Sequence, residues 1–422
     1  MGVLRQAAED LWNGVHSTRD AGHHPFHILN VIEPVSEHVA FYKGFSNLAA
    51  ARTDNGLVLI DTGSYHPKAY QRSFDAVRSW NRDRIHTAIY THGHVDHAYG
   101  LPPFLDEARE QNWEPPEIIG HENIRARMDR YIETEGYNAI INGRQFGHDM
   151  NWPTDPIYPT RVYRERLDLT IGGVEFVLHH GLGETDDHTF VFLPQERVRY
   201  TGDLFIWASP NAGNPQKVQR YVGEWAAALR TMERFHAEIL LPGHGLPIFG
   251  AERVCEALSN TASYLESIYE QTVSLLNEGA TIYELIDRVH PPADLSDKPY
   301  LQPIYDEPEF LVRTIYRLLA GWYSGIPSEM KPATPRAQAG EIVALAGGIE
   351  PLLARAGQLL ESKDYRLASH LVDWAVHAEP DNSSAQQVRA EVYDARAKAE
   401  LSTMSKGIYG AAAAASRDRA GA

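Results

Sequence analysis

Short apolar runs separated by turn residues dominate the chain from about residue 38 to residue 250. The runs at residues 38–44, 50–63 and 85–93 predict strands, with Asp54, Asn55 and Gly56 as a tight hairpin turn inside the second. Residues 65–81 instead carry apolar side chains at helical spacing. Further strands are predicted at residues 116–121, 175–181, 189–194, 198–203 and 237–245. Because strands and helices interleave, the pattern predicts sheet layers covered by helices.

The pattern changes near residue 251, after which strand signals nearly vanish. Residues 251–279 predict one long helix, and residues 290–303 form a proline-rich connector. From residue 308 onward amphipathic helical patterns dominate, and we expect the last residues, 406–422, to be disordered.

One stretch of this second half has the spacing of a tetratricopeptide-type helical hairpin. Tyr365, Ala368, Ala375 and Pro380 fall at the offsets of such a repeat. A single repeat cannot bury both of its faces. We therefore expect it to pack on neighbouring helices or on another subunit.

Composition limits the classes of function. The chain has 422 residues, 43% of them hydrophobic, and a formal net charge of −17, which argues against nucleic acid or an anionic membrane surface as the main partner. It contains no apolar run long enough to span a bilayer and only one cysteine, Cys255, so intrachain disulfides are excluded. The expectation is a soluble, cytoplasmic protein.

The candidate chemistry begins directly after the predicted strand 85–93, where polar ligands crowd into one loop. His92, His94, Asp96 and His97 form an HxHxDH pattern. Alternate side chains of such a loop can point at one place, and imidazole and carboxylate are ligands that zinc prefers. Ordinary hydrogen bonding explains a single histidine in a loop, but this cluster predicts a metal site.

Three later strands also end in possible ligands. Glu184, Asp203 and His244 each stand at a predicted strand terminus, from which a loop can reach the first cluster. The glycines beside Asp203 and His244 permit tight turns near a metal. The order of these motifs predicts a site with more than one ion.

This order of motifs resembles the metallo-β-lactamase superfamily, an αββα sandwich with a two-metal site at one edge. Glu184 stands where histidine is usual in that superfamily, and together with the helical C-terminal half this makes the chain resemble the type III, zinc-dependent alkyl sulfatases. Residues 313–332 and 359–382 resemble that family's helical dimerisation domain. The implied fold class is α+β, a sandwich followed by an all-α, tetratricopeptide-like domain.

The resemblance also implies domain boundaries. An N-terminal extension would be followed by the catalytic domain, the helical dimerisation domain and the tail, at residues 1–37, 38–265, 266–405 and 406–422. It further implies a homodimer formed through the helical domain.

The resemblance implies a ligand assignment for two zinc ions per chain. His92, His94 and Glu184 would hold one ion, Asp96, His97 and His244 the other, and Asp203 would bridge them. Two close ions lower the pKa of a shared water. Asp96 and Asp203 are therefore the expected catalytic residues, with Asp96 also able to orient the water. His179, His180 and His188 flank Glu184, and one of them could be the true ligand instead.

The substrate residues follow less directly. Asn211 matches the family's anion-binding asparagine, but the arginine that accompanies it falls at Pro215 or Gln216, so Lys217 or Arg220 would have to replace it. Asp203 also departs from the family, which carries glutamate there.

Two more residues are candidates for the substrate pocket. Arg144 lies in "NGRQFG", which resembles a pocket-lining loop of the family. Trp207 follows Asp203 closely and could contact an apolar tail, although core packing is the ordinary role of such a residue.

Three functions remain open on the sequence. The first is hydrolysis of an alkyl or aryl sulfate ester, a small anionic substrate with an apolar tail, by a metal-activated hydroxide. The second keeps the metals and changes the bond to a carboxylic ester, lactone, amide or phosphodiester. The third is a docking module with a vestigial or structural metal site. The complete ligand set argues against the third, because a structural zinc needs only four ligands.

Overall fold

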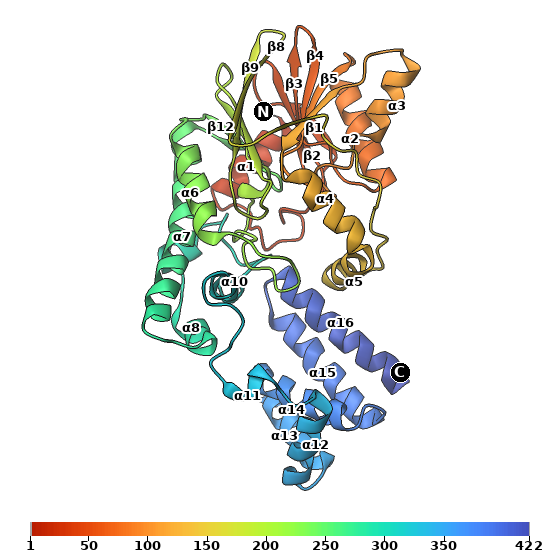
Figure 1. The fold of residues 1–422 in the computed structure, drawn as a ribbon, viewed down its shortest axis with the longest axis vertical. Helices are drawn as coiled ribbons and strands as arrows, with labels where there is room; N and C mark the ends of the chain where they lie inside the picture. The colour runs from red at the N-terminus through yellow and green to blue at the C-terminus, as the bar shows by residue number, and fades with distance from the viewer. Residues whose placement is uncertain (1, 422) are drawn as a thin grey trace. The chain divides into compact units, whose positions relative to one another are not determined.

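The computed structural model describes residues 2–421 and divides them into two compact units, which are described one at a time (Figure 1). The sandwich unit comprises residues up to Glu135 together with Trp152–Gly321, and the helical unit comprises Gly136–Asn151 and the chain from Trp322 onward.

Two mixed sheets form the centre of the sandwich unit. In the first sheet the strands lie in sequence order: β1 (Val31–Pro34), β2 (Val39–Lys43), β3 (Leu48–Thr53), β4 (Gly56–Ile60), β5 (Ile85–Ile89), β6 (Glu117–His121) and β7 (Arg161–Tyr163). Antiparallel hairpins join β1 to β4, and parallel pairing continues from β4 to β7. Parallel strands bring their carboxyl ends to one edge, which is where the loop after β5 begins.

The second sheet has the order β13-β12-β11-β10-β9-β8. Its strands are β8 (Arg166–Ile171), β9 (Val174–His180), β10 (Thr189–Leu193), β11 (Val198–Tyr200), β12 (Ile239–Leu241) and β13 (Ile248–Phe249). Among the described strands of this second sheet, only β11 and β12 pair in parallel; the other neighbours are antiparallel.

Alternation along the first sheet explains why its central strands are buried on both faces. In β4, Val58 and Ile60 point into the core between the sheets, whereas Leu57 and Leu59 point to the opposite face. Side chains alternate across a strand, so a continuous apolar run such as "GLVLI" fills two layers at once.

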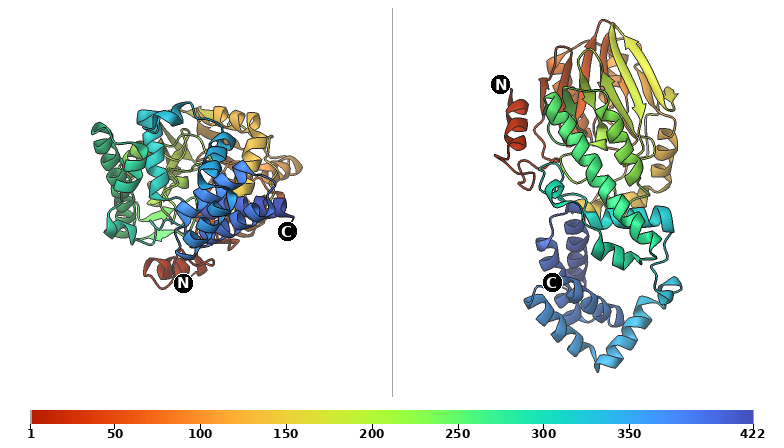
Figure 2. Two further views of the ribbon diagram at one scale, coloured as in Figure 1. Left: turned by 90° about the horizontal axis from the view of Figure 1, so that it is seen from below. Right: turned by 90° about the vertical axis from the view of Figure 1, so that its left-hand side faces the viewer.

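Helices cover the outer faces of both sheets (Figures 1 and 2). Helix α2 (Pro67–Trp80) and α3 (Pro102–Glu110) lie over the first sheet, and α6 (Val222–Glu233) and the long α7 (Ala251–Asn277) run along the second. The unit also contains α1 (Val3–Trp12), α4 (Ile124–Glu133), the 3-10 turn η1 (Gly202–Leu204), α8 (Ile282–Arg288), α9 (Ala293–Ser296) and α10 (Pro308–Ala320). This arrangement and the helical region after it confirm the predicted fold class.

The predicted strands and the helices at residues 65–81 and 251–279 are present, and four strands were missed. Strands β1, β7 and β13 are short or polar. Strand β8 alternates exposed and half-buried positions in "RLDLTI", a period-two signal that the sequence reasoning overlooked.

In the helical unit most helices pack on a sequence neighbour, but the helix Pro335–Ala346 packs mainly on the helix Tyr365–Ala378. Its helices are α5 (Glu135–Phe146), α11 (Pro327–Met330), α12 (Pro335–Ala346), α13 (Ile349–Glu361), α14 (Tyr365–Ala378), α15 (Ser383–Ala399) and α16 (Thr403–Ala420). Asp364 caps α14 by accepting a hydrogen bond from the backbone N–H of Leu367. Across residues 2–421, no helix is both long and apolar enough to cross a bilayer.

The prediction of a disordered tail was wrong, because residues 403–420 form α16. Its alanine run has high helix propensity, Ser402 caps it by accepting from the N–H of Ser405, and Ala413 and Ser416 are buried against the unit. The sequence of this tail has low complexity, which is typical of disorder, but its small residues allow close packing between helices.

The chain between residues 282 and 321 belongs to the core of the sandwich unit. Leu301 and Leu311 have no exposed surface and join the same apolar cluster as the strands between the sheets. The domain boundaries given above stay predictions; the compact unit itself reaches Gly321.

Truncation of Leu311 tests whether this segment of the chain belongs to the core of the sandwich unit. Leu311→Ala should lower the free energy of unfolding of the sandwich unit by about 2–5 kcal/mol, because it leaves a cavity in a packed core. Leu319→Ala on the same helix, where the side chain is 48% exposed, should change it by less than about 0.5 kcal/mol. Urea unfolding followed by fluorescence measures both, and equal effects would contradict the placement.

Candidate metal centre

The loop that follows β5 carries the HxHxDH pattern. Strand β5 ends at Ile89, and the loop runs through residues 90–100 before α3 begins at Pro102. His92 and His97 are fully buried, while His94 and Asp96 retain 18% and 22% side-chain exposure. These two partly exposed side chains therefore connect the centre with solvent.

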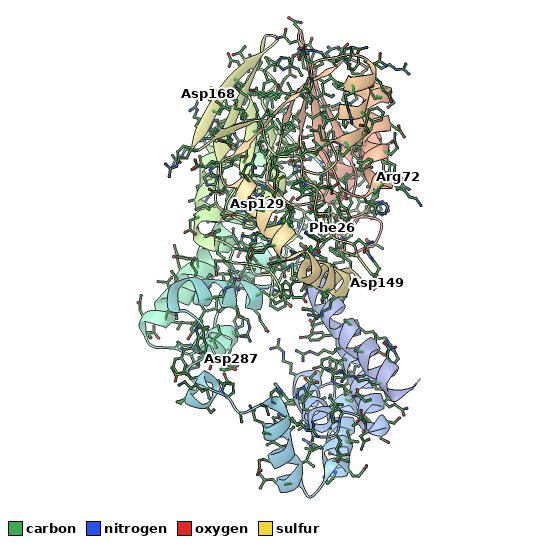
Figure 3. All side chains as sticks on the ribbon, turned by 45° about the vertical axis from the view of Figure 1, so that its right-hand side comes forward. Phe26, Arg72, Asp129, Asp149, Asp168 and Asp287 are labelled. Carbon is green, nitrogen blue, oxygen red and sulfur yellow. The ribbon has the colours of Figure 1, made fainter. Side chains whose placement is uncertain are left out.

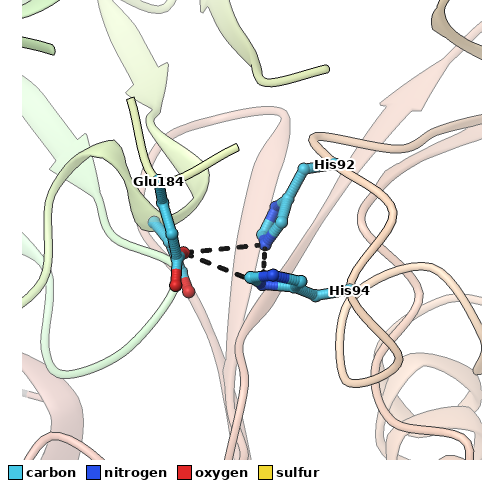
Figure 4. A group of neighbouring side chains, drawn as sticks. His92, His94 and Glu184 are labelled. Carbon is cyan, nitrogen blue, oxygen red and sulfur yellow. Dashed lines mark hydrogen bonds and ion pairs between the residues drawn. The ribbon is translucent and has the colours of Figure 1, made fainter. Parts of the chain in front are cut away.

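A first group of ligands is formed by His92, His94, Glu184 and Asp203, whose ligand atoms all lie within 4.8 Å of one another. Nε2 of His92 is 2.8 Å from Nδ1 of His94. Oε2 of Glu184 faces both nitrogens, at 3.9 Å and 3.7 Å respectively (Figure 4). Three strand ends, those of β5, β9 and β11, supply this group.

A second group contains Asp96, His97 and His244. Oδ2 of Asp96 lies 3.5 Å from Nε2 of His97 and 3.4 Å from Nε2 of His244. The two imidazole Nε2 atoms are themselves 3.4 Å apart.

Asp203 contacts both groups. Besides its place in the first, its Oδ1 is 3.3 Å from Nε2 of His97 and its Oδ2 is 3.4 Å from Nε2 of His244. A Cβ atom at position 243 would lie 2.1 Å from Oδ1 of Asp203, so Gly243 is needed to leave space for the carboxylate. Asp203 therefore lies within reach of both ligand groups.

The second nitrogen of three histidines is fixed by a neighbour. Nδ1 of His97 is 2.9 Å from Oδ2 of Asp61, and Nδ1 of His244 is 2.7 Å from the carbonyl oxygen of Phe45. Nδ1 of His92 lies 2.9 Å from Oγ1 of Thr91. Nε2 of these histidines is therefore directed into the centre, as partners behind metal-binding imidazoles generally ensure.

The donor set fits metal ions. Four imidazoles and three carboxylates converge, which is the ligand chemistry of zinc and related ions. Oε2 of Glu184 is buried and makes no hydrogen bond within the described residues, although buried carboxylate oxygens are normally satisfied. A bound cation would supply that missing partner.

Close packing of these groups shifts their pKa values in opposite directions. Burial alone would lower the pKa of His97, but Asp203, Asp96 and Asp61 raise it well above the usual value. Burial raises the pKa of Glu184 to about 8, although the Arg220 guanidinium opposes the shift. Burial and the nearby His188 lower the pKa of His92 well below the usual value. His92 is therefore neutral and ready to act as a ligand.

The other histidines near Glu184 do not join the two groups. His188 is fully buried and stacks on the ring of His92, with centroids 4.3 Å apart. His180 stacks on His121, and His179 packs on Phe190. His188 therefore packs on the ring of His92 and helps to fix its orientation.

The loop after η1 holds Asn211 against Glu184. Nδ2 of Asn211 donates to Oε1 of Glu184 at 2.5 Å, and Nη1 of Arg220 donates to the same oxygen at 2.6 Å. Arg220 is 3% exposed and also donates to the carbonyl of Asn211. Nη1 of Arg220 thus holds both Glu184 and the backbone of Asn211, while Nε of Arg220 makes no hydrogen bond among the described residues.

The prediction that Trp207 contacts substrate was wrong. Trp207 has no exposed surface, donates from Nε1 to the carbonyl of Leu246 at 2.6 Å, and lies edge-on to Trp12 and Tyr300. A Cβ at Gly245 would come within 2.5 Å of it. Its size and aromatic character serve the core beneath the His244 loop.

Arg144 lies in the helical unit, on the exposed side of α5. There it lines a cleft with residues of α12, α14, α15 and α16. Its role toward a substrate stays a prediction.

Sequence reasoning missed the residues that hold the loop in place. Asp61 accepts from the N–H and the hydroxyl of Thr91, at 2.8 and 2.9 Å. Asp187 accepts from the N–H of Gly93 at 2.7 Å and pairs with the buried Arg127 at 2.8 Å. The aspartate of "LIDTG" sits at a strand end beside the cluster and could have been found. The Arg127 pair, between distant segments, had no local signal.

Two families match separate parts of the chain. Residues 42–244 match the metallo-beta-lactamase superfamily, and residues 281–419 match the alkyl sulfatase dimerisation family.

Curated relatives cover most of the chain. A linear primary-alkylsulfatase from Pseudomonas sp. is 28% identical over 365 residues, which are 80% of this chain and 68% of that protein. The alkyl/aryl-sulfatase BDS1 of Saccharomyces cerevisiae is 26% identical over 373 residues, 83% of this chain and 58% of that protein. The chain thus spans only part of the length of these relatives.

Among solved structures, the stereoselective inverting sec-alkylsulfatase Pisa1 from Pseudomonas sp. has the same fold. The TM-score is 0.83 at 22% identity, with 92% of this chain and 65% of that chain covered.

Replacement of Asp61 tests the support behind His97. Asp61 has φ +58°, a conformation that asparagine also adopts, so Asp61→Asn should keep the backbone and remove only the negative acceptor. We expect the affinity for zinc, measured by competition with a chelator, to fall about 10- to 100-fold. Asp54→Asn, in the exposed hairpin turn, is the matched control and should bind zinc like the parent. Unchanged affinity in Asp61→Asn would show that the contact does not position the ligand.

Proposed function

We propose that this chain hydrolyses the sulfate ester of an alkyl or aryl alcohol. The chain belongs to the metallo-beta-lactamase superfamily and carries an alkyl sulfatase dimerisation domain. The family assignment confirms the resemblance recognised in the sequence. One observation carries the proposal: the two ligand groups, with Glu184 where histidine is usual in the superfamily, occur in a chain whose curated relatives include alkylsulfatases.

The seven ligands would hold two zinc ions, one in each group, with Asp203 shared. When bound, such ions lower the pKa of a water molecule and polarise the ester oxygen. The chain's own residues supply the rest: the buried histidines fix the ligand geometry, and the half-exposed Asp96 can orient the attacking water by accepting its proton.

Lys217 is the residue that we propose to hold the sulfate group. Its side chain is half-buried, and Nζ lies 5.7 Å from the ring centroid of Trp152. Burial and Arg220 lower the pKa of Lys217 to about 7, while the carboxylates of Glu184 and Asp96 act in the opposite direction. The charge of Lys217 is therefore coupled to the charges of two candidate ligands, which supports a role in holding an anionic substrate.

A half-buried aromatic wall beside His244 suits the apolar tail. The ring of Phe26 lies 4.8 Å from His244, 5.0 Å from Phe45 and 4.7 Å from Tyr305, between centroids. Figure 3 labels Phe26 in the sandwich unit, away from Asp168 of β8. This wall replaces Trp207 as the proposed contact of the tail.

Two further parts of the prediction also remain proposals. The dimerisation family that matches residues 281–419 supports a homodimer formed through the helical unit. The acidic composition and the single cysteine are consistent with a cytoplasmic location.

Sulfate release tests the activity. Zinc-loaded protein should bind two ions per chain and release sulfate from medium-chain primary or secondary alkyl sulfates, and Asp96→Ala should lose at least about 10³-fold in kcat/KM because a ligand and water-orienting group is gone. Metal analysis and ion chromatography measure both quantities.

Phe26→Ala tests the aromatic wall. This variant should raise KM more for a dodecyl than for a hexyl ester.

Other outcomes would redirect the proposal. Two bound ions without sulfate release, but with turnover of carboxylic esters, lactones, amides or phosphodiesters, would favour the alternative hydrolase, whose support is the absent arginine at Pro215 or Gln216. No bound metal would favour the docking module.

The pH dependence of KM tests Lys217. Loss of the lysine charge above a pKa of about 7 should weaken binding of the anion, so KM should rise by up to roughly tenfold per pH unit above that value. Lys217→Arg stays charged and should remove this rise, while Lys217→Met should show a high KM at every pH. A parent and a Lys217→Arg variant with the same KM profile would exclude Lys217 as the anion contact.

A further inference from the structure

A cleft in the helical unit gathers arginine side chains from helices that are distant in sequence. Its volume is about 720 Å³, and we call it the arginine cleft. Its lining residues come from α5, the start of α12, the end of α14, α15 and α16. The polar and charged ones are Arg144, Thr334, Arg336, His377, Arg389, Ser416 and Arg419.

The lining of the cleft carries more positive than negative charge. Four arginines and one histidine line it, and none of its described lining residues is an aspartate or glutamate. The chain as a whole has a formal net charge of −17. A cluster of arginines is therefore not what the average composition of the chain would give. Such a field attracts anions.

The arginines differ in how they are held. Arg389 is anchored, because Nε contacts Oδ1 of Asp373 at 2.7 Å and Nη1 donates to Oγ of Ser416 at 2.8 Å. Within residues 2–421, Arg336 and Arg419 make no hydrogen bond or ion pair. Their guanidinium groups can therefore take up a ligand without breaking an existing contact.

The remaining lining is apolar and small. Val376 and Ile408 provide apolar surface, and Ala411, Ala412 and Ala415 leave space along one face of α16. The first turn of α12, capped by the hydroxyl of Thr334, adds backbone dipoles of the sign that favours an anion. The volume of the cleft falls in the range of sites for small organic ligands.

We propose that the arginine cleft binds an organic anion whose oxyanion head is held by Arg336 and Arg419 and whose apolar body lies on the Val376, Ile408 and alanine surface. Guanidinium groups bind planar and tetrahedral oxyanions in a bidentate manner. A bare inorganic anion would leave the apolar part of the cleft unused. The site does not depend on the metal centre or on its activity.

The test is calorimetric titration of the zinc-loaded full chain with octanesulfonate, which has no ester bond to hydrolyse. Two classes of site are expected if the metal centre also binds it. The double variant Arg336→Ala and Arg419→Ala should lose one class, weakened by roughly tenfold or more, with kcat/KM at the metal centre unchanged. Arg355→Ala, an exposed arginine on α13 outside the cleft, is the matched control and should bind like the parent.

The same titrations define what overturns the proposal. Equal binding of octanesulfonate by the parent and the double variant would exclude the site. Inorganic sulfate binding as tightly as octanesulfonate would exclude the apolar contact. A lower mass of the double variant in light scattering, without a change in ligand binding, would show that the cleft instead receives an acidic segment of a second copy.

Discussion

The shared carboxylate of Asp203 is the constraint on which the site depends. It stands within contact distance of His97 and His244 and belongs also to the group of His92 and His94. Burial on this scale is costly for a carboxylate unless opposite charge surrounds it, and the neighbouring imidazoles hold its pKa well below the usual value. The sheets bring three strand ends to one edge, and that convergence is what makes such a shared ligand possible.

Glu184 introduces a second constraint. Where a histidine would offer an imidazole, this residue buries a carboxyl group, whose pKa burial raises to about 8, and Arg220 and Asn211 both donate to its Oε1. One nitrogen of the Arg220 guanidinium is held by this carboxyl group, and we propose Lys217 as the contact of an anionic substrate. Burial and the nearby Arg220 lower the pKa of Lys217 to about 7.

The loop that carries Asn211 is held from a distant part of the chain. Asp306, fully buried, accepts from the N–H of Gly213 at 2.5 Å, and the N–H of Ser209 donates to the carbonyl of Gln302 at 2.8 Å. The proline-rich connector, which reads as a simple linker, therefore belongs to the support of the site. Burial of Asp306 raises its pKa to about 7, the cost of placing a carboxylate where two backbone N–H groups need an acceptor.

The sequence by itself determined the fold class, the central strands and the candidate ligands of the loop after β5, because period-two and period-3.6 apolar patterns and the spacing of HxHxDH are local properties. It also indicated Glu184, Asp203 and His244 through their positions at strand ends. Only the tertiary structure decided which residues support them. The pairing of Arg220 with Glu184, of Asp61 with His97, and the burial of Trp207 each join segments far apart in the chain, and no local pattern encodes such contacts. The last helix likewise gains its order from packing, which an alanine-rich stretch does not reveal.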